Sequence, residues 1–201
     1  MEWIDELENK LWKTKGSRFN ANKRIATENL YSRYSMGFFS ICVIAINLYS
    51  ILLRNFTTND ISNVIPYFSI ILGILILFIS IMERAKGLNL KAEKMLSCAK
   101  EISGLYDKLR LQSSLNKKSL ASEVAEITKE YNSIISKYDN HEPIDYEYFK
   151  TNHPNDFKLS AYEKILIRFK YFVRPRLVHS TLILIIFVAL TGFILATFPE
   201  I

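Results

Sequence analysis

Three apolar stretches constrain this chain more than any other feature. They run from Tyr34 to Leu53, from Val64 to Met82 and from Ser180 to Phe198, each 19 or 20 residues long and free of charged side chains. At about 1.5 Å of rise per residue, helices of this length reach roughly 28 to 30 Å, the thickness of the hydrocarbon core of a bilayer. The sequence therefore predicts an all-α integral membrane protein with three transmembrane helices.

The distribution of Lys and Arg predicts the orientation of these helices. Residues 1–33 hold seven basic residues and residues 83–178 hold eighteen, whereas the connection 54–63 holds one. Because basic residues near span ends resist translocation, we expect a multi-pass protein of the cell inner membrane, with the N-terminus and the middle segment in the cytoplasm and the C-terminus outside. The first apolar stretch begins too late for a cleaved signal peptide. The predicted segments are N-terminal cytoplasmic helices (1–33), a transmembrane pair with a short outside loop (34–82), a cytoplasmic helical hairpin with a polar segment (83–159), an amphipathic interfacial helix (160–178) and a third transmembrane helix with an outside tail (179–201).

The N-terminal segment carries helix boundary signals. We expect a short helix from Trp3 to Trp12, a stop at Gly16 and a second helix that begins at Arg18 with Ser17 as its N-cap and runs into the first span. Its basic residues are expected to anchor the chain to anionic lipid headgroups. These residues are Arg18, Lys23, Arg24 and Arg33.

The middle segment contains two heptad patterns separated by turn residues. Apolar residues recur at alternating spacings of four and three, which predicts two helices that pair as an antiparallel hairpin. The pattern leaves open whether the apolar stripe closes on its partner helix alone or also on neighbouring subunits. The first seam is Leu88, Ala92, Met95, Ala99, Ile102, Tyr106 and Leu109, and the second is Leu120, Val124, Ile127, Tyr131, Ile134 and Tyr138.

The polar segment from Asp139 to Asp156 loses this periodicity and is the most site-like part of the chain. His141, His153 and Asp156 fit no zinc or calcium-loop spacing, so a hydrogen-bonded loop on the hairpin is favoured over a metal site. No nucleophile motif or glycine-rich phosphate loop occurs, so we expect no catalytic residue and no cofactor. The two cysteines, Cys42 and Cys98, are interpreted as packing residues, although a redox role for Cys98 is an alternative.

Ser160 and Glu163 form a capping box that predicts a helix start. Apolar residues on one side of this helix and Lys and Arg on the other predict an amphipathic helix in the cytoplasmic interface of the membrane. We expect residues 174–176, of sequence Arg-Pro-Arg, to turn the chain into the third span.

Asn47 is the polar residue that stands out within the spans. A buried amide in hydrocarbon needs a partner, so Asn47 either fastens two helices together or lines a pore, and fastening is favoured. No charged residue lies in any predicted span, which argues against proton pumping and voltage sensing.

Three motifs resemble those of the SLATT family, the two-span effector domains found with SMODS nucleotidyltransferases and SLOG proteins in prokaryotic conflict systems. They are residues 11–21 (LWKTKGSRFNA), residues 92–105 (AEKMLSCAKEISGL) and residues 130–149 (EYNSIISKYDNHEPIDYEYF), and the resemblance covers roughly residues 5 to 150. The third apolar stretch departs from a two-span pattern and is interpreted as an appended element. The residues that the resemblance singles out on the cytoplasmic side are Trp12, Thr14, Arg18, Asn140, His141, Asp145 and Tyr146.

The resemblance implies a membrane effector of an antiviral, anti-phage system. Such a protein is expected to form a homo-oligomer in the lipid bilayer and, on a cytoplasmic signal, to open a pore or disrupt the inner membrane, so that the infected cell stops growing or dies. It also implies a signal-generating partner, a nucleotidyltransferase or a reverse transcriptase system. Trp12 to Arg18 and Asn140 to Tyr146 would then link the signal to opening.

Two other functions compete with this one. A membrane-anchored scaffold would use the hairpin to recruit a soluble partner, without ion flux. A membrane enzyme using His141, Asp145 and Tyr146 ranks last, because no paired nucleophile and base is present. Specific nucleic-acid binding is not expected, since the eighteen basic residues of segment 83–178 are interspersed with thirteen acidic ones.

Overall fold

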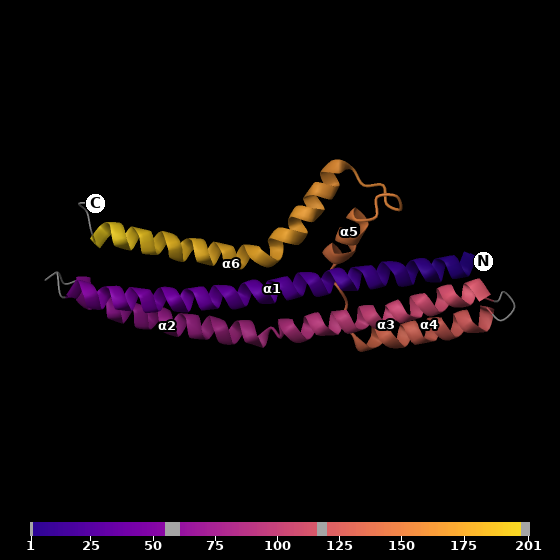
Figure 1. Cartoon of the computed structure of the whole chain (residues 1–201), viewed down its shortest axis with the longest axis horizontal. Coiled ribbons are helices and arrows are strands. Elements are labelled where there is room, and N and C mark those ends of the chain that lie inside the picture. The colour runs from indigo at the N-terminus through magenta and orange to yellow at the C-terminus, as the bar shows by residue number, and fades with distance from the viewer. Residues whose placement is uncertain (1, 55–60, 116–119, 198–201) are drawn as a thin grey trace. The chain divides into compact units, whose positions relative to one another are not determined.

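The computed structural model describes residues 2–54, 61–115 and 120–197. The described residues form helices joined by turns, which confirms the all-α part of the predicted fold class. It divides into two units, one made of residues 1–27 and 88–175 and the other of residues 28–87 and 176–201. Figure 1 shows the order of the helices, which are α1 (Glu2–Arg54), α2 (Ile61–Ala85), α3 (Leu88–Leu115), α4 (Leu120–Lys137), α5 (Pro143–Thr151) and α6 (Ala161–Thr197).

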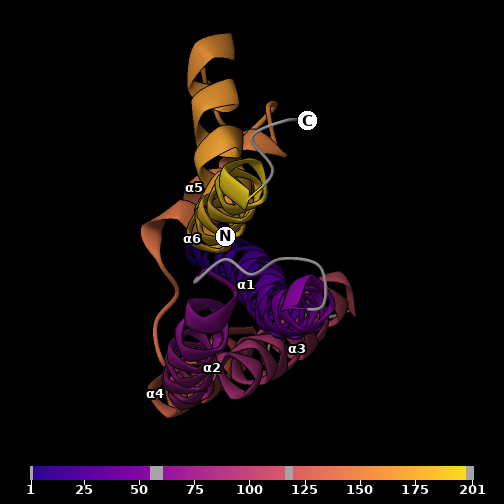
Figure 2. The same ribbon diagram turned by 90° about the vertical axis from the view of Figure 1, so that its left-hand side faces the viewer.

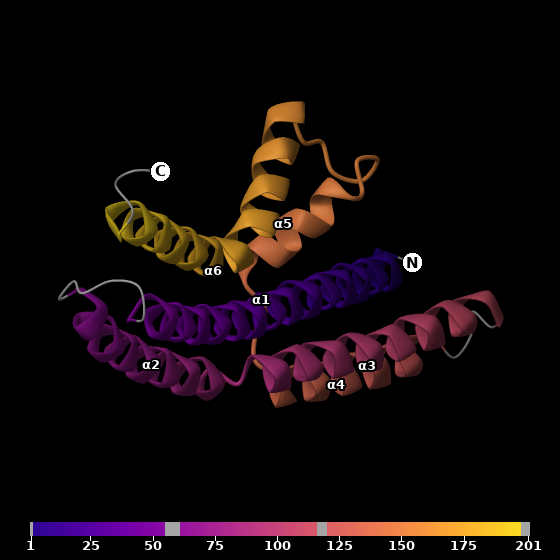
Figure 3. The ribbon, with the colours of Figure 1, turned by 60° about the vertical axis from the view of Figure 1, so that its left-hand side comes forward.

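The first unit is built on the pairing of α3 with α4, which lie side by side in Figures 1 and 3. Lys108 of α3 lies 3.5 Å from Glu130 and 3.9 Å from Glu126 of α4. Glu101, which is nearer the start of α3, lies 3.8 Å from Lys137, which is nearer the end of α4. The two helices are therefore antiparallel, because residues nearer the start of α3 pair with residues nearer the end of α4. The expected loop between them, residues 116–119, lies outside the described residues.

The apolar seam of this hairpin is covered by the first turns of α1. Leu7 and Leu11 of α1 are buried in the same cluster as Ile102, Leu109 and Ile127 of the hairpin. Burial of such side chains contributes roughly 1.5–3 kcal/mol each. The seam that the heptad spacing indicated is therefore closed within the chain by a third helix.

The predicted helix stop at Gly16 is wrong, because α1 continues without interruption from Glu2 to Arg54. A Cβ atom at Gly16 would lie 2.1 Å and 2.2 Å from ring atoms of Phe149, so glycine is needed here for close packing and not for a turn. Ser17 is not an N-cap either, since its hydroxyl donates to the Lys13 carbonyl at 2.8 Å inside the helix. The helix does run into the first apolar stretch, as expected, but as a continuation of α1.

The second unit contains the remainder of α1, α2 and the end of α6. Figures 1 and 2 both show α1 and α2 side by side here, and Ser32 of α1 donates to the Glu83 carboxylate of α2 at 3.0 Å. Gly87 follows α2 with a φ of +60°, a conformation that glycine adopts without steric cost, and separates α2 from α3.

The helices of the second unit expose apolar side chains on most of their described surface. A helix that is apolar all round is typical of a membrane span. Among the described residues, one range, Pro66–Ser114, which takes in most of α2 and α3, contains a segment long and apolar enough to cross a membrane by length and composition, and 6% of that segment is buried. The three-span topology therefore stays a prediction. Exposed residues include Tyr34, Ile41, Ile44, Leu48 and Ile51 of α1 and Tyr67, Phe68, Ile70, Ile71, Ile74, Leu77 and Phe78 of α2.

The helix α6 begins at the predicted capping box. The Ser160 backbone N–H donates to Glu163 Oε2 at 2.8 Å, and the Glu163 backbone N–H donates to Ser160 Oγ at 3.2 Å. No break in the helix accompanies the expected turn at residues 174–176, because α6 continues through Pro175 to Thr197. Proline removes one backbone hydrogen bond but does not end the helix.

Candidate functional site

A buried ion pair joins α1 to α5 in the first unit. Arg24 Nε donates to Asp145 Oδ1 at 2.8 Å and its Nη2 donates to Asp145 Oδ2 at 3.0 Å. The Arg24 side chain is 5% exposed and that of Asp145 is 0% exposed. Two parallel bonds between a guanidinium and a carboxylate fix both the distance and the orientation of the partners. This clamp, Arg24 with Asp145, is the centre of the site.

The sequence around Asp145 explains how its side chain comes to face α1. Pro143 occupies the first position of α5, where a proline ring fits and no N–H is needed. Asp145, two residues later, accepts the Glu142 backbone N–H through Oδ2 at 3.0 Å, which caps the helix start. The predicted loop in this part of the chain is therefore wrong, since residues 143–151 form a helix whose N-terminal turn positions the carboxylate.

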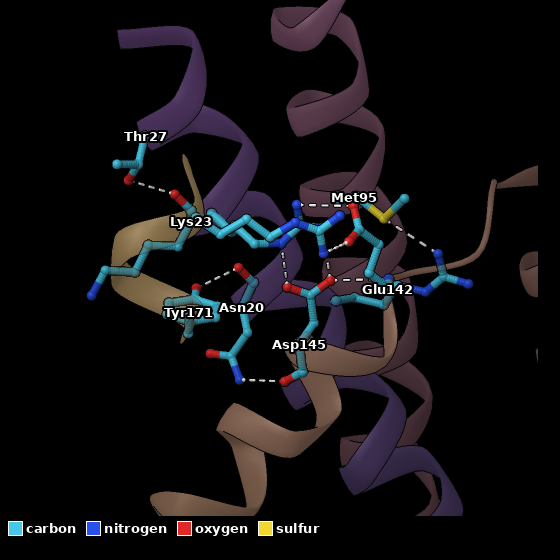
Figure 4. Close-up of polar contacts among 10 residues, drawn as sticks. Asn20, Lys23, Thr27, Met95, Glu142, Asp145 and Tyr171 are labelled. Carbon is cyan, nitrogen blue, oxygen red and sulfur yellow. Dashed lines mark hydrogen bonds and ion pairs between the residues drawn. The ribbon is translucent and has the colours of Figure 1, made fainter. Parts of the chain in front are cut away.

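Glu142 extends the clamp to α6. Its Oε1 lies 3.1 Å from Arg24 Nη1, and its other oxygen accepts from Arg174 Nη1. A second link comes from Tyr171 of α6, which is 3% exposed and donates its hydroxyl to the Asn20 carbonyl of α1 at 2.7 Å (Figure 4). Asn20 in turn donates its amide to the Asp145 carbonyl at 3.1 Å. The start of α6 is therefore held to both α1 and α5.

Arg18 lies one and a half helical turns before Arg24 and is also buried, at 3% exposed. Its Nη1 donates to the Asp139 carbonyl. The same Nη1 donates to the Met95 sulfur at 3.3 Å, and Nη2 donates to Asn140 Oδ1 at 3.4 Å. The guanidinium thus holds the chain that leads into α5 against α1 and α3.

His141 occupies this junction without a hydrogen bond to its Nδ1 atom among the described residues, although that atom is buried. Burial lowers the pKa of His141, and the guanidinium groups of Arg18 and Arg24 lower it further, while Asp145 raises it. The lowered pKa favours the neutral imidazole beside these two permanent cations.

A cluster of rings lies next to the clamp. The Trp12 ring meets those of Phe149 and His153 edge-on, with centroids 4.8 Å apart in both pairs, and is stacked with Phe157 at 6.2 Å. Tyr146 joins through Phe149, with centroids 6.3 Å apart. The cluster packs α5 onto the first third of α1.

The structure brings together most of the residues that the sequence singled out. Arg18, Asn140, His141 and Asp145 meet at the start of α5, and Trp12 and Tyr146 meet through the ring cluster. Thr14 lies apart from the clamp, with its hydroxyl 3.1 Å from that of Tyr131 on α4.

Sequence reasoning did not single out Arg24, Glu142 or Phe149 as site residues, although Glu142 and Phe149 lie within the motif of residues 130–149. Arg24, like Arg18, was expected to reach lipid headgroups, and that interpretation is wrong because both guanidinium groups are buried inside the protein. Lys23 and Arg33, the other two of the four basic residues, are exposed. The proline and acidic residue at the start of α5 were a local signal for the cap, but no local signal identifies the arginine that it pairs with.

Asn47 lies in the second unit and has its amide satisfied. Its Oδ1 accepts from Ser69 Oγ of α2 at 2.8 Å, and its Nδ2 donates to the Val43 carbonyl at 2.8 Å. Ser69 is 1% exposed. These bonds support the helix-fastening interpretation of Asn47.

The described residues offer little for metal or thiol chemistry. Within ranges 2–54, 61–115 and 120–197, no group of three or more His, Cys, Asp or Glu side chains is placed to hold a metal ion. Cys98 is fully buried in the hairpin core, and burial raises the pKa of its thiol, which disfavours the reactive thiolate.

Comparison with known proteins identifies one family. A family model described as SMODS and SLOG-associating 2TM effector domain family 5 matches residues 1–192. The match includes residues 180–192, so most of the third apolar stretch lies inside the family model and not beyond it. No curated protein and no solved structure matches the chain.

Proposed function

Because the chain belongs to the SLATT family of SMODS and SLOG-associating two-transmembrane effector domains, we propose that it oligomerises in the inner membrane of a prokaryote and permeabilises it on a cytoplasmic signal. The family places the chain among effectors of conflict and defence systems. In this proposal, loss of the membrane barrier arrests growth or kills the infected cell and so limits phage replication.

The observation that carries the proposal is the apolar surface of the second unit. Side chains such as Ile41, Leu48, Ile74 and Phe78 are 59–66% exposed on helices that contain no charge over these stretches. Exposed apolar area costs about 25 cal/mol per Å² in water, so these surfaces need lipid or other copies of the chain around them. Both surroundings are part of the proposed assembly.

We further propose the predicted three-span topology. The Lys and Arg residues of segments 1–33 and 83–178 favour a cytoplasmic position for both, and the end of α6 then takes the C-terminus outside. A reporter fused after Ile201 tests this directly. Activity of an alkaline phosphatase fusion, which needs the outside compartment, supports three spans, and activity of a cytoplasmic reporter at that position contradicts them.

The clamp is proposed to receive the signal. Arg24 of the clamp and Asn47 of the span lie on the same helix, α1, so a change at the start of α5 has a covalent path to the membrane segment. The signal itself is proposed to come from a partner of the kind found with this family, a nucleotidyltransferase or a reverse transcriptase system.

Membrane potential in living bacteria tests the proposal. A voltage-sensitive dye is followed as the wild-type chain is induced, alone and with its genomic neighbours, beside a variant that lacks residues 180–198 and a vector control. Depolarisation before loss of viability supports the effector function. A chain that inserts, never depolarises the cell in either setting and still pulls down a soluble partner through α3 and α4 is a scaffold, and the effector proposal fails.

A further inference from the structure

The first half of α6 carries a row of exposed apolar side chains in the first unit. Tyr162, Ile165 and Phe169 are 73%, 69% and 62% exposed, and Leu166 is 36% exposed. These four residues recur at spacings of three and four, so they form one continuous row along the helix. We call this row the α6 stripe.

The opposite side of the same helical segment is held to the protein. Tyr171 lies two residues after Phe169 and therefore projects away from the stripe. It is 3% exposed, and its ring is stacked on that of Tyr148 of α5, with centroids 3.9 Å apart. Its hydroxyl donates to the Asn20 carbonyl of α1 at 2.7 Å. The helix cannot rotate to bury the stripe without breaking these contacts, so the stripe faces outward.

Basic side chains flank the stripe. Arg168 and Lys170 are both exposed, and steps of 100° along the helix place them on opposite flanks of Phe169. Residues 161–175 hold four Lys or Arg and a single acidic residue, Glu163, which is engaged in the helix cap. An apolar row between basic flanks is typical of a helix that lies on an anionic bilayer, with the cationic groups reaching lipid phosphates.

A second copy of the chain fits this surface less well than lipid does. Pairing two identical stripes would bring the basic flanks of both copies together, and like charges repel. Four apolar side chains also fall short of a stable protein interface, which usually contains about 20–30 residues on each side. An anionic lipid surface meets neither difficulty, because its phosphate groups attract the same flanks.

The position of the stripe in the chain also favours lipid. Phe169 is eleven residues before Ser180, where the third span of the proposed topology begins. The interval is helical, so no more than about 17 Å of helix separates the stripe from that span. The inference therefore rests on the membrane location in the proposed function.

We propose that the α6 stripe docks onto the anionic phospholipid surface of the bilayer, with its apolar side chains at the acyl-chain boundary and Arg168 and Lys170 on lipid phosphates. Tyr171 holds the docked segment to α1 and α5. The first unit, which contains the clamp, is thereby fastened to the bilayer at a place other than the spans.

Lipid quenching in the full chain tests the proposal. Cys42→Ala removes one thiol, and Cys98 stays because it is fully buried. One cysteine is then added and labelled with the fluorophore NBD, in separate chains, at three exposed positions: Ile165→Cys in the stripe, Leu48→Cys in the first apolar stretch and Lys129→Cys on α4. The labelled chains are placed in nanodiscs, at one and at several chains per disc, with phospholipids spin-labelled near the headgroup or deep in the acyl chain. A chain without an added cysteine measures background labelling.

The label at position 165 should be quenched chiefly by the shallow spin label in discs that contain phosphatidylglycerol. The quenching should exceed that at position 129 about threefold or more, because interfacial helices bury their apolar face below the headgroups. Lys170→Glu in the Ile165→Cys chain should lower the ratio of docked to undocked label about fivefold or more, since a basic residue near an anionic surface adds attraction. Lys100→Glu, an equal charge change at an exposed position of α3, is the matched control and should leave the ratio unchanged.

Quenching at position 48 with none at position 165 would overturn the proposal and leave the membrane location intact. If neither label is quenched, the membrane location fails together with the proposal. A label at position 165 that is shielded only at several chains per disc, without lipid quenching, would assign the stripe to a second copy and overturn docking on lipid. Equal quenching in discs of phosphatidylcholine alone, unaffected by Lys170→Glu, would overturn the role of anionic lipid.

Discussion

Arg24 and Asp145 are 121 residues apart in the chain and form a two-bond ion pair from which water is almost entirely excluded. A charge pair of this kind is costly to bury and is retained only where both partners are well satisfied. Asp145 meets this condition with three hydrogen bonds to its two oxygens. The pair fixes which face of α1 meets the start of α5.

Asp145→Asn should destabilise the first unit strongly. The substitution leaves the Arg24 guanidinium buried without a carboxylate that fits it, which typically costs about 3–5 kcal/mol. Urea unfolding in mild detergent, followed by Trp12 fluorescence in the Trp3→Phe background, measures the change. Glu147→Gln on the same helix is the matched control and should cost less than about 1 kcal/mol. Equal stabilities of the two variants would show that the pair does not hold α5.

Gly16→Ala should destabilise the protein, although alanine usually stabilises a helix. The new Cβ would lie within 2.2 Å of the Phe149 ring, and overpacking of this kind costs about 1–3 kcal/mol. Gly104→Ala in α3 is the control, because no atom lies within 4 Å of its added Cβ, and it should stabilise by about 0.5–1 kcal/mol. Phe149→Leu should relieve part of the defect in Gly16→Ala. The packing described here requires Gly16→Ala to lower the stability and Gly104→Ala to raise it. A stabilising Gly16→Ala would contradict this packing.

Asn47→Leu and Ser69→Ala should have the same effect if the amide fastens α1 to α2. Hydrogen bonds between membrane helices contribute about 0.6 kcal/mol on average, so each single variant should lose a similar small amount of stability and the double variant should lose little more. Unfolding in detergent in a double-mutant cycle measures the coupling. Two results would instead indicate that Asn47 faces a pore. One is that the stability losses of the two variants are additive, and the other is that Asn47→Leu changes the membrane conductance whereas Ser69→Ala does not.

His141 should make the stability of the first unit depend on pH. Its pKa is lowered in the folded protein, chiefly by burial and then by Arg18, so the unfolded chain takes up a proton first as the pH falls. The contribution of His141 is therefore complete above its ordinary pKa of 6.5 and is lost as the pH falls through the lower folded value. His141→Gln should flatten the stability profile between about pH 7 and pH 5. An unchanged slope in that variant would assign the pH dependence to other groups.

The helical hairpin was predictable from sequence because its signal is local. Apolar residues of one helix face recur at fixed spacings, and Ile102, Leu109, Ile127 and Ile134 are buried as that spacing indicates. The capping box that begins α6 is equally local. The sequence did not reveal that the first turns of α1 would cover the hairpin, since Leu7 and Leu11 lie in a stretch whose apolar spacing has several interpretations.

The clamp was not predictable for the opposite reason. Asp145 was singled out by its motif, but nothing near Arg24 distinguishes it from Lys23, which is exposed one residue earlier. The role of Gly16 was not predictable either, because glycine can end a helix or permit close packing. Which of the two roles applies depends on Phe149, which lies 133 residues away in the chain. The need of Asn47 for a partner followed from its burial in an apolar stretch, whereas the identity of Ser69 as that partner required the fold.

Electrical recording from the purified chain in planar bilayers tests the central claim most directly. The wild-type protein is reconstituted in lipids that include anionic species, insertion is verified by resistance to alkaline extraction, and current is recorded at fixed voltage beside protein-free bilayers. The proposed effector function predicts discrete current steps whose frequency rises steeply with the protein-to-lipid ratio, as expected for an oligomer. Fully inserted protein that passes no current at any ratio, with or without lysate from phage-infected cells, would contradict it.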